Sequence, residues 1–205
     1  EAEYYELSHS QKRFWILSNF KDGSEAYNVA GVFSVTGKLN IDAFKKAFDS
    51  VIERHEILRT VFSETDGDPN QKILSLKELG FRVEEIDLRN ETNLDKIKKK
   101  KIEEDAKLPF DLKKGPLSRA TLFHEDENKF VVLFNIHHII SDGWSKGIFV
   151  KEFLYYCNIY CENEKSSLTS LPIQYKDYAA WHNSSFALQG KYWSELYGKG
   201  IPVLN

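Results

Sequence analysis

A nearly continuous apolar run, KFVVLFNIHH at residues 129–138, constrains the fold more than any other stretch of the chain. Successive side chains of a strand point to opposite faces, so a strand that is apolar at nearly every position needs cover on both faces. We therefore expect this strand in the interior of a sheet that has helices or other layers on both sides. The two histidines at its end place titratable rings where a buried strand stops.

The remaining segments supply the other strands and the covering helices. Asn40 is expected to cap one helix, Ser145 another, and Ser8 with Gln11 forms a capping-box pattern for a helix that stops near Gly23. Strands and helices that do not alternate strictly predict an α+β fold, a mixed β-sheet with packed helices. The expected strands are 28–37, a hairpin from LRTVFSE to QKILSL, FRVEEIDL and 117–123; helices are expected at 93–107 and in two closing segments, 173–183 and 187–198.

Composition and charge argue against several classes of partner. The 28 basic and 31 acidic side chains give a net charge of -3, which is no electrostatic footprint for nucleic acid or an anionic membrane surface. No apolar stretch approaches the ~20 residues of a membrane span, and no leader precedes the fold. We expect a cytoplasmic protein, cut from a longer chain. Cys157 and Cys161 are expected to pack in the core rather than to form a disulfide or bind metal.

The pair His137 and His138 is the candidate for chemistry. Neighbouring residues of a strand face opposite ways, so one ring is expected to be structural and the other to project into a cleft. Asp142 is expected in a tight turn that Gly143 permits through a positive φ. An imidazole is suited to proton transfer near neutrality. Adjacent histidines diverge and no third ligand is evident, so no metal is expected. The residues alone leave two interpretations open, an acid–base site or a hydrogen-bonded structural histidine.

A family resemblance narrows this choice. HHIISDGWS, residues 137–145, resembles the His-His-x-x-x-Asp-Gly signature of the condensation domains of nonribosomal peptide synthetases, members of the chloramphenicol-acetyltransferase-like superfamily. The resemblance implies a chloramphenicol-acetyltransferase-like lobe: residues 1–190 as the N-terminal lobe of a V-shaped domain and 191–205 as the start of the connection to a C-terminal lobe. Four further stretches resemble these domains in the same order: LSHSQKRFWIL, RHEILRTVF, LPFDLKKGPLSRATLF and YKDYAAWHN.

The resemblance also implies an activity and roles for particular residues. Two thioester substrates, each on the phosphopantetheine of a carrier protein, meet at His138, where the acceptor amine attacks the donor thioester. His138 acts as general base or positions the amine, and Asp142 makes a structural ion pair with Arg54 or, as the second candidate, Arg59. The expected catalytic set is His137, His138, Asp142 and Gly143, whose N–H helps to hold the oxyanion; Trp144 and Ser145 are expected to bind substrate.

The implied partners are the donor and acceptor peptidyl carrier proteins, the C-terminal lobe and an adenylation domain, with no directly bound cofactor. Heterocyclising relatives carry aspartates in place of the two histidines, so ordinary amide formation is favoured, and GWS with SQKRFWIL resembles domains that join two L-configured residues. Two alternatives stay open: an acyltransferase that uses a thioester donor with an alcohol or amine acceptor, and a non-catalytic docking module of the same fold. The isolated lobe is expected to have little activity.

Overall fold

The computed structural model describes residues 2–18 and 25–198. The expected helix stop at Gly23 and the last residues of the expected connection, 199–205, lie outside that part. Helix α1 (His9–Ser18) begins with the predicted capping box, in which the Gln11 N–H donates to Ser8 Oγ (3.2 Å) and the Ser8 N–H donates to Gln11 Oε1 (2.9 Å). This reciprocal pair fixes the direction in which α1 leaves the chain start, and so fixes where α1 meets the sheet.

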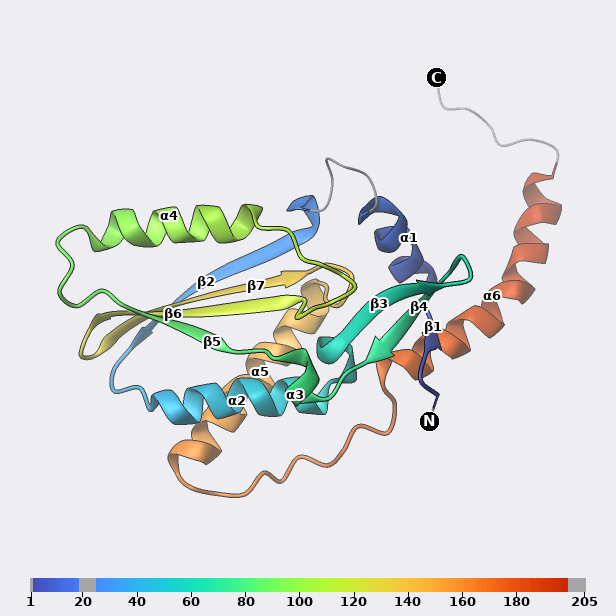
Figure 1. The fold of residues 1–205 in the computed structure, drawn as a ribbon. Helices are drawn as coiled ribbons and strands as arrows, with labels where there is room; N and C mark the ends of the chain where they lie inside the picture. Colours follow the sequence, from blue (N-terminus) through green and yellow to red (C-terminus); the bar gives the residue numbers. More distant parts are fainter. Residues whose placement is uncertain (1, 19–24, 199–205) are drawn as a thin grey trace.

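The apolar run forms β7 (Lys129–His137), an interior strand of a four-stranded sheet, as the sequence predicts (Figure 1). The strand order is β2 (Asn28–Thr36), β7, β6 (Ser118–Asp126), β5 (Val83–Asp87). The β5–β6 pair is parallel and the other two pairs are antiparallel, so the sheet is mixed. One outer edge is β2, which pairs with β7 from Asn28 opposite His137 to Thr36 opposite Lys129.

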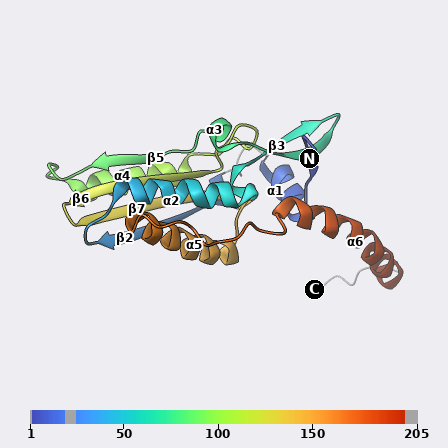
Figure 2. The same cartoon turned by 90° about the horizontal axis from the view of Figure 1, so that it is seen from below.

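Helices cover both faces of this sheet, which explains why β7 is apolar throughout. Helix α4 (Leu94–Lys107) lies over one face, where Val131 and Leu133 pack with its apolar residues. Helices α2 (Ile41–Arg54) and α5 (Gly143–Cys161) lie against the other face (Figure 2). There the alternate β7 residues Val132 and Ile136 join the main core. Asn40 caps α2 as predicted, since the Ala43 N–H donates to its side-chain oxygen (3.1 Å).

A smaller antiparallel sheet stands beside the first. The predicted hairpin is β3 (Thr60–Thr65) and β4 (Asp68–Ile73), and the short β1 (Tyr5–Glu6) pairs with the other side of β4. Phe62 on β3 is fully buried, and its N–H donates to the Leu112 carbonyl (2.8 Å). The remaining short elements are the 3₁₀ turns η1 (Glu25–Tyr27) and η2 (Glu56–Arg59) and helix α3 (Leu76–Leu79).

The chain closes with one long helix, α6 (Tyr175–Tyr197), where two segments were predicted. The polar residues that suggested a break are satisfied within the helix or against β1: Ser184 Oγ donates to the Trp181 carbonyl (2.7 Å), and Asn183 Nδ2 donates to the Leu7 carbonyl (3.0 Å). Figure 2 shows α6 running away from the two sheets. Among the described residues, no helix is both long enough and apolar enough to cross a bilayer.

The two cysteines of α5 do not share one environment. Cys157 is half-buried against the main core, whereas Cys161 is exposed, so the prediction that both pack in the core is wrong for Cys161. Cys161 is the last residue of α5, where the helix has passed the end of α2 and has no layer to pack against. Burial raises the pKa of the Cys157 thiol to about 12, so this side chain stays a neutral thiol at physiological pH.

Candidate functional site

The end of β7 places the two histidines in different environments. The His137 N–H donates to the Leu117 carbonyl and the His138 N–H to the Tyr27 carbonyl, both at 2.9 Å. The backbone of the pair is therefore held from both neighbouring strands, β6 on one side and the start of β2 on the other. With the backbone fixed in this way, the alternation of strand side chains sends the two rings in different directions.

His137 is the inward-facing ring. It is 1% exposed, and its Nδ1 accepts a hydrogen bond from the Ile139 N–H (3.0 Å). Burial, helped by the neighbouring His138, lowers the pKa of His137 from its ordinary value of 6.5 to about 4. The neutral ring, whose Nδ1 accepts, carries its proton on Nε2, and this buried atom has no protein partner among the described residues. The predicted division into one buried and one projecting histidine is confirmed for this member of the pair.

A prediction about acid stability follows from the buried ring. Between about pH 6.5 and pH 4 the unfolded chain binds a proton at position 137 that the folded protein excludes, so the free energy of unfolding decreases as pH falls through this window. We expect this single group to cost about 3 kcal/mol by pH 4. His137→Asn, which keeps an acceptor for the Ile139 N–H, removes that contribution. Urea unfolding of both proteins at several pH values measures the difference, and parallel pH profiles would contradict it.

His138 is the outward ring and is half-buried. It stacks on Phe14 of α1, with ring centroids 5.1 Å apart and an interplanar angle of 22°. Phe14 in turn makes an edge contact with Tyr27, whose carbonyl holds the His138 backbone. Helix α1 thus orients the imidazole through an aromatic contact that sequence reasoning missed. The RFW triplet offered a signal, since aromatic residues on an amphipathic helix must face some part of the core.

Asp142 caps helix α5, which differs from the expected role. Its Oδ1 accepts from the Ser145 N–H (2.7 Å) and from Ser145 Oγ (2.6 Å). These two hydrogen bonds, the side-chain one first, lower the pKa of the Asp142 carboxyl group. The cap is therefore Asp142 and not Ser145, because a carboxylate matches the free N–H groups and positive dipole of a helix start better than a hydroxyl. Gly143 is the first residue of α5, and the predicted positive φ there is wrong.

The predicted ion pair between Asp142 and an arginine is also wrong. Arg54, the first candidate, donates from Nε to both carboxylate oxygens of Glu152 at 3.2 Å. Arg59, the second candidate, donates from Nη1 to the Leu74 carbonyl (2.7 Å) and lies 3.8 Å from Glu56. Each guanidinium has partners near its own segment, while the cap of α5 takes the Asp142 carboxylate. Within residues 2–18 and 25–198, no arginine pairs with Asp142.

The capping role sets the expected cost of removing the carboxylate. For Asp142→Ala we expect a loss of about 1 kcal/mol in the free energy of unfolding, as for other N-caps, in place of the larger loss expected for a broken buried ion pair. Asp142→Ser, which keeps a hydroxyl acceptor for the Ser145 N–H, should recover most of it. Urea titration gives both values. A loss for Asp142→Ala well above that of a cap would contradict the assignment.

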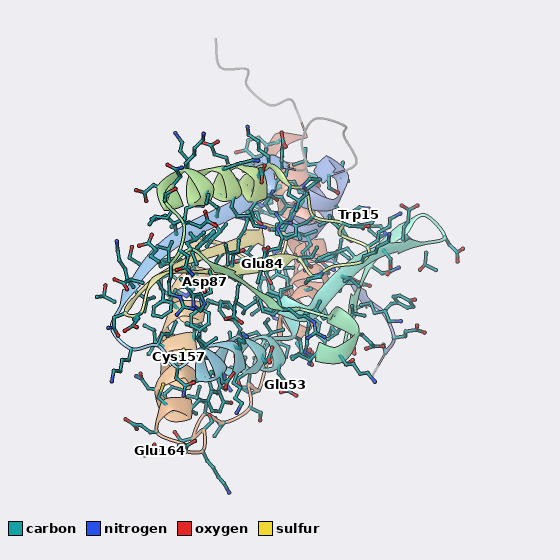
Figure 3. The ribbon with its side chains drawn as sticks, turned by 60° about the vertical axis from the view of Figure 1, so that its left-hand side comes forward. Trp15, Glu53, Glu84, Asp87, Cys157 and Glu164 are labelled. Carbon is teal, nitrogen blue, oxygen red and sulfur yellow. The ribbon has the colours of Figure 1, made fainter. Side chains whose placement is uncertain are left out.

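The two residues expected to bind substrate differ in their surroundings. Trp144 is 82% exposed on the first turn of α5. Ser145, besides bonding to Asp142, lines a cavity of about 370 Å³ between the sheet and helices α2 and α5. Figure 3, in which Cys157 marks α5 and Glu53 marks α2, shows these two helices beneath the strands. The cavity walls contain residues just before and just after His138, namely Ile136, Ile140 and Ser141, whereas the His138 ring is not among the lining groups.

A buried polar network supports β7 from the opposite face, and sequence reasoning missed it. Asp105, near the end of α4, accepts from Arg119 Nε (2.9 Å) and from the side-chain amide of Asn135 (2.8 Å). The Arg119 guanidinium lies 3.8 Å from the centre of the Phe110 ring. Asn135 is two residues before His137 on the same face of β7. The network therefore fixes the strand directly upstream of the histidines.

Comparisons with known proteins agree with this geometry. The condensation domain family model matches residues 1–205. The chain is 38% identical over its full length to bacitracin synthase 3 of Bacillus licheniformis, of which it covers 3%. It is 38% identical over 95% of its length to malpibaldin synthetase of Mortierella alpina, of which it covers 4%. The chain thus spans only a small part of these curated relatives.

Solved structures show the same fold. A crystal structure of the starter condensation domain of rhizomide synthetase RzmA matches with a TM-score of 0.84 at 20% identity, covering 95% of this chain and 48% of that one. The first condensation domain of the calcium-dependent antibiotic synthetase matches with a TM-score of 0.81 at 16% identity, covering 100% of this chain and 50% of that one. The predicted fold, an α+β lobe of chloramphenicol-acetyltransferase type, is confirmed. Because the family model spans every residue, this chain belongs to the condensation domain family.

Proposed function

We propose that residues 1–190 are the N-terminal lobe of a condensation domain of a nonribosomal peptide synthetase and that residues 191–205 begin the connection to a second lobe. The complete domain joins a donor aminoacyl or peptidyl thioester to an acceptor aminoacyl thioester through an amide bond. The observation that carries this proposal is the half-buried His138 at the end of β7, beside a neutral, buried His137, in a chain that matches the family along its whole length.

The reaction at His138 is an acyl transfer to nitrogen. The acceptor amine attacks the donor carbonyl carbon, the C–N bond forms, and the C–S bond breaks as the thiol of the donor arm leaves with a proton. His138 accepts the proton from the attacking nitrogen, or holds the amine by a hydrogen bond in line with the carbonyl. The Gly143 N–H lies at the first position of α5, where the positive end of the helix dipole favours the developing oxyanion.

Positioning contributes more than proton transfer in this scheme. Aligning two tethered reactants supplies effective molarities of ~10⁵ M or more, roughly 7 kcal/mol, whereas proton transfer to a side chain usually supplies ~10²- to 10⁴-fold. The contacts that hold His138, a backbone hydrogen bond to Tyr27 and the stack on Phe14, suit a residue that orients a nucleophile.

The proposed partners follow from the substrates. Donor and acceptor peptidyl carrier proteins bring the two thioesters on their phosphopantetheine arms, an adjacent adenylation domain activates the amino acids, and the second lobe closes the other wall of the passage. The lobe itself then needs no bound cofactor, and we place the protein in the cytoplasm. The net charge of -3 gives no sign of a nucleic acid partner.

An assay with the complete domain tests this function. Two carrier proteins loaded with aminoacyl thioesters are mixed with the domain, and the amide product is measured by mass spectrometry under single-turnover conditions. An ester formed from an alcohol acceptor, with no amide, would favour the related acyltransferase. No transfer to either acceptor, with carrier binding retained, would favour a docking module. The 205-residue chain alone should form little product and should self-associate, because Trp144, Ile148 and Leu154 leave an exposed apolar face on α5.

A further inference from the structure

The cavity beneath the sheet has the construction of a binding site. Its volume of about 370 Å³ is within the range of ligand pockets and more than twice the ~150 Å³ of an apolar cavity that binds benzene. Every lining residue lies between Val29 and Leu154, so this lobe alone forms the walls. Most of the lining is aliphatic or aromatic, including Phe44 and Phe48 of α2 and Phe149 and Phe153 of α5.

The cavity extends away from the histidine loop along the outer strand pair. On β2 the alternate residues Val29, Gly31, Phe33 and Val35 line it, so one face of the strand forms a wall. Val29 pairs with Ile136, two residues before His138, and Val35 pairs with Phe130 at the opposite end of β7. Six residues of strand correspond to about 20 Å, which sets the length of this wall.

Polar groups gather at the end near the histidines. Ser141, Ser145 and Lys146, which follow His138 in the chain, line that end. The far end is bounded by Val35 and Leu154. The imidazole of the other polar lining residue, His55, is engaged by Glu152 at 2.6 Å. A ligand with a polar reactive head and an apolar tail fits this distribution, with the head at the histidine loop and the tail along β2.

Gly31 keeps the middle of the cavity open. A Cβ at this position would lie 3.0 Å from two atoms of the Phe33 ring, so the ring occupies the space above the glycine backbone. Phe33 is half-exposed, as are Ile148 and Leu154 across the opening on α5. These side chains line an apolar entrance at the edge strand of the sheet, through which a chain can enter without unfolding the lobe.

We propose that this cavity binds the apolar tail of the donor thioester, a chain on the order of ten carbon atoms in size, and thereby selects donors by the length of that tail. The inference rests on the proposed function for the word donor, but the binding itself does not. The tail is either a linear acyl chain or an extended apolar side chain of an aminoacyl group. Each buried methylene should raise affinity about fourfold until the cavity is full.

Isoleucine methyl signals of the complete domain test the inference. The domain is titrated with butanoyl, hexanoyl, octanoyl and dodecanoyl N-acetylcysteamine thioesters, and with the leucyl thioester to separate the two kinds of tail. We expect saturable shifts at Ile136, Ile140 and Ile148, which line the cavity. Ile97 and Ile102, which pack on the other face of the sheet, serve as internal references. Binding without a rise in affinity with chain length, or shifts at the references alone, overturns the proposal.

Variants at the far end provide the matched control. Val35→Phe should shorten the preferred chain and Val35→Ala should lengthen it, whereas Val32→Phe, the same change on the opposite face of β2, should leave the preference unaltered. Equal effects of the two phenylalanine variants contradict the assignment. If the methyl signals do not respond while amide forms, the cavity inference fails and the proposed function stands. If they respond and no amide forms, the proposed function fails and the cavity inference stands.

Discussion

Replacing His138 with alanine is expected to lower the single-turnover rate of amide formation by about 10²- to 10⁴-fold in the complete domain. The variant loses both the proton acceptor and the group that aligns the amine, while the backbone hydrogen bond to Tyr27 remains. The side chain is half-buried and stacks on Phe14, so its removal should lower the free energy of unfolding only modestly. Rapid-quench assays with loaded carriers and urea titrations measure the two effects separately.

His138→Gln distinguishes the two roles of the imidazole. Glutamine accepts a hydrogen bond from the amine but does not take a proton at neutral pH. Recovery of most of the rate therefore supports positioning, and a rate as low as that of the alanine variant supports general base catalysis. A normal single-turnover rate for His138→Ala is the result that excludes a catalytic role for this residue. His137→Asn, which alters the adjacent buried ring, shows whether any loss is specific to position 138.

Asp105→Ala is expected to have the largest effect on stability, a loss of about 3 to 5 kcal/mol in the free energy of unfolding. The Asp105 side chain is 6% exposed, and its removal leaves the Arg119 guanidinium and the Asn135 amide without their acceptor. An uncompensated charge beneath a sheet costs far more than the net value of the ion pair. Urea denaturation measures the loss, and Asp105→Asn, which keeps one acceptor oxygen, should lose less.

Asp95→Ala is the matched control on the same helix. Asp95 pairs with Lys98, but its side chain is 90% exposed, so we expect a change below about 1 kcal/mol. If the two alanine variants lose the same amount, the buried network contributes no more than a surface ion pair. Because Asn135 precedes His137 on the same face of β7, Asp105→Ala should also slow amide formation in molecules that remain folded.

Local patterns in the sequence predicted the layers around β7 well. The apolar run places β7 inside a sheet, the period of 28–37 identifies β2, and the caps at Ser8 and Asn40 locate two helix starts; each of these depends on neighbours within a few positions. The same reasoning separates His137 from His138, because strand alternation alone requires the two rings to diverge.

Contacts between distant segments could not be predicted in this way. The stack of Phe14 on His138 and the bond of Asp105 to Asn135 join residues that no periodicity relates. The partner of Asp142 depended on a competition between an arginine and the free N–H groups of α5, and the local partner prevailed because it is already in place when the helix forms. Tertiary geometry, rather than residue type, decides such cases.

The pairing of β2 with β7 has a consequence for how the protein folds during synthesis. The partner of Asn28 is His137, so roughly 100 residues must be made before the outer strand can pair. At typical translation rates this takes about 5 to 20 s, during which an apolar strand waits without its neighbour. Such distant pairing slows folding and leaves the nascent chain open to association with other strands. Chaperone dependence of expression should therefore be relieved by changes in β2 rather than in the locally paired β3–β4 hairpin.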